Sequence, residues 1–312
     1  MGCIMNLVAA IVVTYNRQEF LVKCIHALLE QSIKCDILII DNASTDKTFE
    51  YIKQAKKEYQ NIFYFNTGEN LGGAGGFNYG IKKALFMKYK YIWLMDDDCF
   101  PTKTALEILL KYDKILNGKY GWLASEVLWT DFSLCKMNYP KLKRRIKNNF
   151  DMYHLIEAIQ ASFVSLFLTV DTVKCVGLPV KEFFIWGDDV EFTRRIAVRK
   201  KLKSFYVPES KVIHAMRDNN GSNIATDTVS RLDRYIYAFR NEYFLFHKEG
   251  IKGILFYHMK CCFNILKIIC IAKSERIKRM KIIIDGYMKG KNFHPCIEYF
   301  QTRNEESQCL KK

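Results

Sequence analysis

No CxxC pair occurs in this sequence, although it contains 11 cysteines among its 312 residues. A disulfide framework is therefore not indicated, and several cysteines, such as Cys24, lie inside apolar segments with helical spacing. We expect these thiols to be reduced and buried, as in a cytosolic protein. The first residues also lack a charged region followed by an apolar core, so we expect no cleaved signal peptide.

Acidic residues are too few to balance the basic ones, because 33 Asp and Glu stand against 48 Lys and Arg. The resulting net charge of +15 indicates an anionic partner: nucleic acid, a phosphorylated substrate or an acidic lipid surface. A merely soluble, basic surface is the simpler alternative. Zinc-finger spacing and RNA-binding signatures are both missing, so we expect no nucleic acid partner.

Apolar, β-branched runs alternate with helical patterns in the first hundred residues, which predicts a parallel sheet with helices on both faces. The predicted strands of this part are residues 7–15, 36–41, 62–65 and 91–95. Polar motifs follow each of them, and ligands of such sheets bind beyond the carboxyl ends of the strands. We therefore expect one shared site there. Further strands are predicted at residues 162–170, 204–207 and 211–215.

Three aspartates, Asp96, Asp97 and Asp98, follow the strand at residues 91–95. In an extended chain, Asp96 and Asp98 point to the same side and repel each other unless a cation lies between them. Mg²⁺ or Mn²⁺ is the natural partner of such oxygen ligands and commonly also holds substrate phosphates. Asp97 points the other way, toward the substrate that provides the transferred group or toward the backbone. Capping of the next helix is the alternative, but it needs only one acid.

A glycine-rich loop is predicted at residues 70–78, with a helix from about Phe77. Glycine lets the backbone approach a ligand closely, so the loop suits a phosphate or a sugar. The spacing matches neither a Walker loop nor a dinucleotide-binding loop. A flexible surface turn is the alternative.

Two further acids, Asp188 and Asp189, follow Trp186 at the start of a predicted helix. A carboxylate beside an aromatic wall can have a raised proton affinity and serve as a general base. The alternative is an acidic helix N-terminus favoured by the helix dipole. His214 ends an apolar stretch and is either a satisfied core histidine or a third metal ligand.

Together these motifs resemble the family 2 glycosyltransferases, which have the GT-A fold. The matching segments are VVTYNR (12–17), IDNASTD (40–46), NLGGAGGFNYG (70–80), WLMDDDCFP (93–101), FFIWGDDVEFTRR (183–195) and His214. RYIYAFRNEYF (234–244) is similar to a helix that follows the catalytic domain in rhamnosyl- and galactofuranosyltransferase-like members.

The resemblance implies an α/β fold, with a Rossmann-like, mostly parallel sheet flanked by helices. It implies a catalytic domain over residues 1–228, whose nucleotide-sugar half is about 1–100 and whose acceptor half is about 101–228. A helical, basic region would follow at 229–312. The enzyme would be an inverting, metal-dependent hexosyltransferase.

The resemblance also implies a role for each matching residue. Asp189 would be the catalytic base, with Asp188 beside it, and Trp186 would shape the acceptor site. Mn²⁺ or Mg²⁺ would be held by Asp96, Asp98 and His214. Asp41 would contact the uracil or ribose. The donor-binding residues would be Thr14, Tyr15, Asn16, Arg17, Asp41, Asn70, Gly72, Gly73, Asp96 and Asp97.

The glycine-rich segment departs from the family pattern. Many members have Ala-Arg-Asn-x-Gly where this chain has GFNYG at residues 76–80, so an arginine that could reach the donor is absent. The GGAGGF form is similar to galactofuranosyltransferases, which favours UDP-galactofuranose as the donor, with dTDP-rhamnose as the alternative. The acceptor would be a hydroxyl of a glycan or a lipid-linked glycan in bacterial polysaccharide synthesis, such as O-antigen or capsule.

Residues 251–291 are strongly basic, and residues 253–271 are mostly apolar. Lys260, Asn264 and Lys267 interrupt the apolar stretch on one helical face, and spanning a bilayer would bury both lysines. We expect an amphipathic helix on an anionic membrane, and hence peripheral attachment to the inner face of the cytoplasmic membrane. For this helix, the alternative is packing against the core. For the protein as a whole, the alternatives are a non-catalytic membrane-surface protein and, as another enzyme class, a nucleotidyltransferase. A homo-oligomer is possible.

Overall fold

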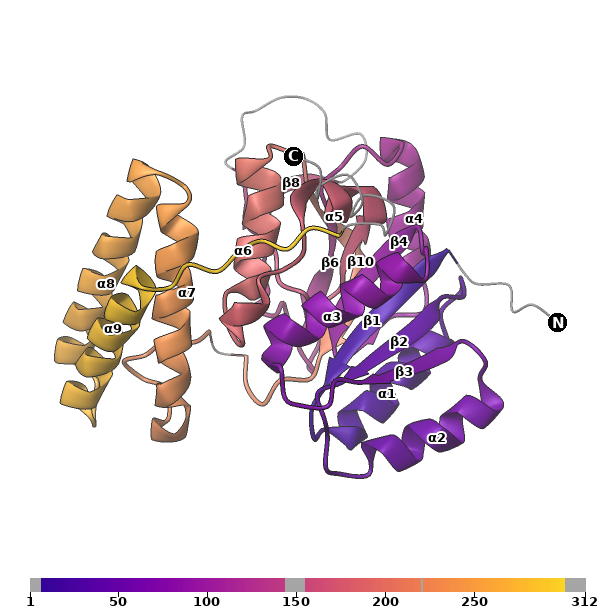
Figure 1. Ribbon diagram of the computed structural model, residues 1–312, viewed down its shortest axis with the longest axis horizontal. Coiled ribbons are helices and arrows are strands. Elements are labelled where there is room, and N and C mark those ends of the chain that lie inside the picture. The colour runs from indigo at the N-terminus through magenta and orange to yellow at the C-terminus, as the bar shows by residue number, and fades with distance from the viewer. Residues whose placement is uncertain (1–6, 144–154, 220, 301–312) are drawn as a thin grey trace, which may run out of the picture.

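The computed structural model describes residues 7–143, 155–219 and 221–300. Within these ranges one ten-stranded sheet forms the centre of the molecule, in the order β3-β2-β1-β4-β9-β6-β10-β8-β7, and β5 pairs with β10 (Figure 1). The parallel part contains β1 (Val8–Thr14), β2 (Asp36–Asp41), β3 (Ile62–Asn66) and β4 (Tyr91–Asp96). The other strands are β5 (Cys99–Pro101), β6 (Leu123–Leu128), β7 (Lys141–Leu142), β8 (Ile156–Gln160), β9 (Leu166–Thr169) and β10 (Phe205–His214).

Two hydrophobic cores lie on opposite faces of the sheet, because successive strand residues alternate between the faces. Ala10 and Val12 of β1 pack in one core, and Ala9 and Ile11 pack in the other. The first core takes helices α1 (Gln18–Leu29), α2 (Thr48–Glu58) and α4 (Ala105–Leu116). The second core takes α3 (Gly72–Phe86), α5 (Val170–Val176) and α6 (Asp188–Arg194).

The predicted mixed α/β fold with a mostly parallel central sheet is confirmed, although three boundaries differ. The helix expected from about Phe77 begins at Gly72, so most of the predicted glycine-rich loop is helical. Residues 204–207 and 211–215 belong to one strand, β10, with an irregularity between Val207 and Lys211. The strand expected at 162–170 is shorter and runs antiparallel between β4 and β6.

Three helices follow the sheet: α7 (Tyr235–His247), α8 (Ile251–Ile271) and α9 (Arg276–Lys291). They share a separate core that includes Phe239 of α7, Ile268 of α8 and Ile282 of α9. Figure 1 shows them beside the sheet, after which the chain returns toward α3 and α5. There the Leu178 amide donates to the Glu298 carbonyl at 2.8 Å, and Lys82 pairs with the Glu298 carboxylate at 2.7 Å.

Candidate active site

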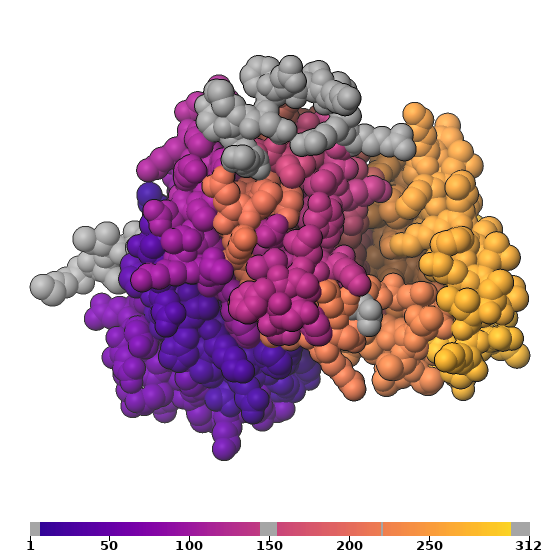
Figure 2. Space-filling view, turned by 180° about the vertical axis from the view of Figure 1, so that it is seen from behind, coloured from indigo at the N-terminus to yellow at the C-terminus, as the bar shows by residue number. Residues whose placement is uncertain are grey.

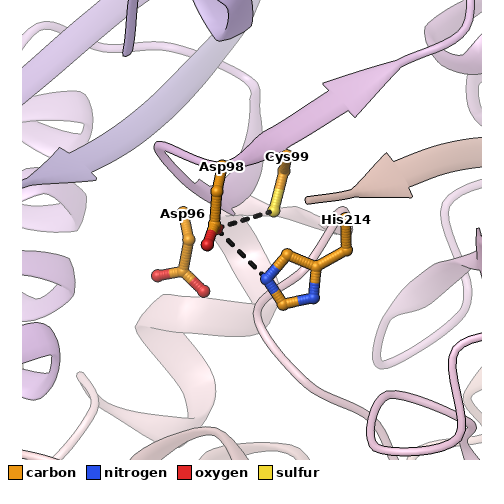
Figure 3. Close-up of side chains that lie close together, drawn as sticks. All are labelled: Asp96, Asp98, Cys99 and His214. Carbon is orange, nitrogen blue, oxygen red and sulfur yellow. Dashed lines mark hydrogen bonds and ion pairs between the residues drawn. The ribbon is translucent and has the colours of Figure 1, made fainter. Parts of the chain in front are cut away.

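The acidic cluster forms where β4 ends and β5 begins. Asp96 is the last residue of β4, and three residues later Cys99 begins β5, which pairs antiparallel with β10. In that register Cys99 lies opposite His214, so the pairing carries the histidine to the aspartates (Figure 3). One candidate ligand atom each from Asp96, Asp98, Cys99 and His214 lies within 4.8 Å of the others. The sequence motif and the distant histidine therefore form one site.

His214 has two defined partners. Its Nε2 lies 3.1 Å from Asp98 Oδ1, and its Nδ1 lies 2.9 Å from Asn138 Oδ1. The amide of Asn138 donates through Nδ2 to Ser162 Oγ at 2.9 Å, so its Oδ1 accepts from His214 Nδ1–H. This fixes the ring and directs Nε2 to the aspartates, as an outer partner does for a metal-binding histidine.

This donor set fits a hard divalent cation. Two carboxylates and one imidazole nitrogen suit Mn²⁺ or Mg²⁺. Cys99 was not predicted here, but burial raises the pKa of its thiol well above the usual value. It therefore stays protonated and is a poor ligand. We take Asp96, Asp98 and His214 as the residues that would hold the ion.

Without a cation, the charges of the cluster are balanced by its own bases. Burial alone would raise the pKa of Asp98, but the hydrogen bond and charge of His214, together with Arg17, hold it well below the usual range. Burial would lower the pKa of His214, yet Asp98 raises it to about 10. Burial and the charge of Asp98 raise the pKa of Asp96 to about 6.

Arg17 bridges the two aspartates that follow β4. Its guanidinium lies 3.0 Å from Asp97 Oδ1 and 2.7 Å from Asp98 Oδ2. Thr14 donates to the other oxygen of Asp97 at 2.7 Å. Asp97 is thus bound to residues of the first strand and its loop, and burial raises its pKa to about 7. From the sequence we predicted that Thr14 and Arg17 bind the donor. Their contacts with Asp97 and Asp98 were not predicted.

The residues that the sequence predicts to bind the nucleotide lie at the carboxyl ends of β1 and β2. Asp41 is buried, and its carboxylate accepts from the Ser44 amide at 2.8 Å and from the Tyr64 hydroxyl at 2.7 Å. Asn16 has a positive φ and accepts from the Thr45 amide at 2.7 Å. Tyr15 is exposed. Asn16 and Arg17 border a surface depression that is separate from the cavity described below.

The glycines of α3 have different surroundings, which corrects the picture of a ligand-binding loop. A Cβ on Gly72 would lie 2.1 Å from the Phe184 carbonyl oxygen, and one on Gly76 would lie 2.6 Å from Val13 Cγ1. These two glycines therefore serve close packing. Gly73 has open space beside it and lines the cavity described below. Asn70, which is exposed, accepts from the Gly72 amide at 2.9 Å.

Asp188 and Asp189 occupy the first turn of α6. Burial and the neighbouring charge of Asp189 raise the pKa of Asp188 well above its usual range. Burial raises the pKa of Asp189 to about 6, although the Val190 amide donates to its Oδ1 at 2.7 Å. Asp188 therefore has the higher proton affinity of the pair, and Asp189 is the better candidate for a base near neutral pH.

A buried asparagine of α7 holds the segment before these acids. Asn241 Nδ2 donates to the carbonyls of Phe183, Ile185 and Trp186 at 3.0, 3.2 and 2.7 Å. This segment needs support because Phe184 and Trp186 both have positive φ, which is costly for bulky residues. The sequence pattern associated Asn241 with a family helix but gave no sign of this contact.

One cavity of about 430 Å³ joins most of the predicted catalytic residues. Its walls include Asp96, His214, Asp188, Asp189 and Trp186. On the opposite side it is lined by residues of the C-terminal helices, Glu242, Lys260 and Asn264. Lys260 and Glu242 form an ion pair across α7 and α8. The cavity therefore has an acidic wall and a mixed polar wall.

Comparison with known proteins agrees with this geometry. Residues 9–116 match the sequence model described as Glycosyl transferase family 2. This segment therefore has the sequence of a family 2 glycosyltransferase domain. The galactofuranosyltransferase GlfT1 of Mycolicibacterium smegmatis is 26% identical over 272 residues, which are 80% of this chain and 86% of that relative. The glycosyltransferase AglE of Haloferax volcanii is 27% identical over 60% of each chain.

Solved structures support the GT-A fold. A crystal structure of GalNAc-T7 with UDP, GalNAc and Mn²⁺ aligns with a TM-score of 0.63 at 12% identity, covering 89% of this chain and 54% of that chain. S. aureus TarS 1–349 in complex with UDP-GlcNAc aligns with a TM-score of 0.53 at 13% identity, covering 98% and 76%. At such identities the likeness establishes the fold alone.

Proposed function

We propose that this enzyme transfers a sugar, with inversion, from a nucleotide-sugar to an acceptor hydroxyl, and that the preferred donor is UDP-galactofuranose. The observation that carries the proposal is the shared cavity. It brings Asp96 together with Asp188, Asp189 and His214, which all lie more than ninety positions later in the chain. A phosphate-anchoring cluster and a base beside one cavity are what a single displacement at the anomeric carbon requires.

The protein's own groups would divide the work. Asp189 would accept the proton of the acceptor hydroxyl, and the oxygen would then attack the anomeric carbon from the face opposite the phosphate. Burial and the charge of Asp189 raise the pKa of Asp188, which disfavours a second negative charge beside the base. Asp96, Asp98 and His214 would hold Mn²⁺ or Mg²⁺, which supplies positive charge for the departing nucleoside diphosphate.

The donor assignment has two supports. The relative that matches over 86% of its own length is named a galactofuranosyltransferase, and the aligned structures include complexes with UDP and UDP-GlcNAc. Gly73 leaves space beside the first turn of α3, where backbone amides can approach a diphosphate. A dTDP-rhamnose donor is the competing assignment.

The acceptor side would be the wall made by α7 and α8. Glu242, Lys260 and Asn264 offer both hydrogen-bond acceptors and donors for sugar hydroxyls, and Trp186 offers an aromatic wall. We infer a glycan or lipid-linked glycan acceptor, in the synthesis of a bacterial surface polysaccharide such as O-antigen or capsule.

A donor screen by nucleoside-diphosphate release tests the proposal. UDP-galactofuranose should give turnover, with dTDP-rhamnose, UDP-glucose and UDP-GlcNAc as the competing donors. Excess chelator should abolish the release, and added Mn²⁺ or Mg²⁺ should restore it. Turnover only with another donor would overturn the sugar assignment, and full activity in chelator would overturn the metal role.

A further inference from the structure

The outward side of α8 is apolar along its length. The side chains of Leu255, Met259, Phe263, Leu266 and Ile269 recur every three or four residues, so they share one helical face. Their exposed fractions are 58%, 69%, 57%, 59% and 51%. We call these five residues the outer face of α8. An apolar face of this extent, left open to water, marks an interaction surface.

The neighbouring helix continues the pattern. On α9, Ile277, Ile284 and Met288 are 80%, 55% and 51% exposed. Figure 2 shows α8 and α9 together forming one flank of the molecule. The core of the three-helix unit is supplied by other residues of both helices, such as Ile268 and Ile283. The exposed side chains are therefore not needed for packing within the unit.

Positive charge accompanies this apolar surface. Residues 251–291 contain ten Lys and Arg but only Glu275 and Asp285 as acids. Lys252, Lys267, Lys273 and Lys281 have no acidic partner within the described part of the chain. Long basic side chains beside apolar groups can place their stems in an acyl region and their charges among phosphates.

We propose that the outer face of α8, together with the exposed apolar residues of α9, docks this enzyme on an anionic lipid bilayer. The charge selects this partner, because a second copy of the chain would bring equally basic surfaces together. The docking lies beyond the sugar transfer proposed above and does not depend on the donor. It would place the protein on the inner face of the cytoplasmic membrane.

Helix α8 lies on the membrane in this arrangement and does not cross it. By length and composition it is the one described helix that could span a bilayer, with 11% of its apolar window buried. Its other side, however, carries Lys260 and Asn264, which line the catalytic cavity. A spanning helix would draw that cavity wall into the acyl region, at a cost of several kcal/mol per charge.

The same helix thus connects the two surfaces. A lipid-linked glycan would present its hydroxyl from the bilayer that the outer face of α8 contacts, and the opposite side of α8 borders the cavity. The lipid surface would concentrate the acceptor next to Asp189. This step rests on the proposed function, whereas vesicle binding itself does not.

Vesicle flotation with the full chain tests the docking. Wild-type protein should bind vesicles of phosphatidylcholine and phosphatidylglycerol, and bind far less to phosphatidylcholine alone. The triple variant Leu255→Gln, Met259→Gln, Leu266→Gln should lower vesicle affinity by at least about 100-fold, because each side chain contributes strongly to apolar burial. A matched control, Phe86→Gln, replaces a side chain that is 76% exposed on α3 and should bind like wild type.

Charge and orientation need two further measurements. Lys267→Gln with Lys273→Gln and Lys281→Gln should weaken binding about 100-fold at low salt, at roughly fivefold per lysine. An alkaline carbonate wash should release the wild-type protein. Release of nucleoside diphosphate with a soluble acceptor should be unchanged in the apolar variant, which separates docking from catalysis.

Four results would overturn the proposal. Wild-type protein could ignore anionic vesicles, or the apolar triple variant could bind them normally. Retention after the carbonate wash would show a spanning helix. Concentration-dependent dimers that the triple variant abolishes, with no vesicle binding, would assign the surface to a second copy of the chain.

Discussion

At the scale of single residues, the catalytic proposal depends on the different environments of two adjacent carboxyl groups. Burial raises the pKa of both Asp188 and Asp189, and the charge of Asp189 raises that of Asp188 further, whereas the Val190 amide stabilises the ionised form of Asp189. The pKa of Asp189 is about 6, so it is ionised at neutral pH. A general base must be ionised to accept a proton, whereas a general acid must be protonated to donate one.

Replacing Asp189 by Asn should lower kcat by about 10³-fold, as expected for loss of a general base. In the wild type, kcat/KM should fall as the pH decreases through about 6, because protonation removes the base. Nucleoside-diphosphate release over a pH series measures both. Asp171→Asn, at an exposed position on α5, is the charge-matched control and should behave like wild type. Full activity of Asp189→Asn would refute its assignment as the base.

At the scale of elements, the glycines of α3 show how a helix is fitted against a sheet. Gly80 faces Ile11 and Ile40 as closely as Gly76 faces Val13. The pattern GGAGG in the sequence suggested a ligand loop. Gly76 and Gly80 instead let α3 approach β1 and β2, and Gly72 packs against the Phe184 carbonyl, whereas Gly73 lies at the cavity.

The paired variants Gly76→Ala and Gly73→Ala test this division. The first should destabilise the fold by about 1–3 kcal/mol, because the new Cβ overlaps Val13 Cγ1 in a packed region. The second meets nothing within 4 Å and should leave the free energy of unfolding unchanged within about 1 kcal/mol. Urea denaturation compares them. Equal destabilisation by both would contradict the packing role.

A second element-level contact joins α7 to the segment 183–186. Asn241→Ala would remove the Nδ2 donor from the Ile185 and Trp186 carbonyls, while the Phe183 carbonyl still accepts from the Ile185 amide and from Arg240. We expect a loss of about 1–3 kcal/mol in stability. Because this segment leads into Asp188 and Asp189, kcat should also fall by about 10²-fold.

The matched control for Asn241 is Asn61, whose amide donates to the Cys35 carbonyl at 2.8 Å. Asn61→Ala should destabilise the protein without changing kcat. Stability comes from urea denaturation and kcat from nucleoside-diphosphate release. If both variants lose stability and neither loses kcat, Asn241 is structural only.

At the scale of the whole molecule, the C-terminal helices are tied to the catalytic sheet at several points. Arg194 of α6 makes a two-pronged ion pair with Glu249, at 2.7 and 2.6 Å, and both side chains are largely buried. Glu298 contacts Lys82 of α3. Together with the hydrogen bonds of Asn241, these contacts join residues on both sides of the domain boundary that the sequence predicts at residue 228.

The full chain should therefore unfold in a single transition, with equal calorimetric and van't Hoff enthalpies. A chain ending at Thr228 should lose donor turnover and have a lower Tm, since Asn241 and the Glu249 carboxylate are gone. A chain ending at residue 300 keeps every described element and should match the wild type in both. Two separate transitions, or an active chain of 228 residues, would contradict this view.

The sequence by itself determined the alternation of strands and helices and the placing of polar motifs at strand ends. Both follow from periodicity over a few residues, which is a local property. Asp96, Asp98 and Asp189 could be identified for the same reason, because their motifs are short and contiguous.

Only the tertiary structure decided which distant groups meet. The pairing of β5 with β10 sets His214 against Asp98, and the packing of α7 sets Asn241 against the segment 183–186. It also turned Lys260 toward the cavity and the apolar side of α8 outward. Periodicity shows that a helix has two faces. Which face is buried depends on what packs against it, and that is settled by contacts between residues far apart in the chain.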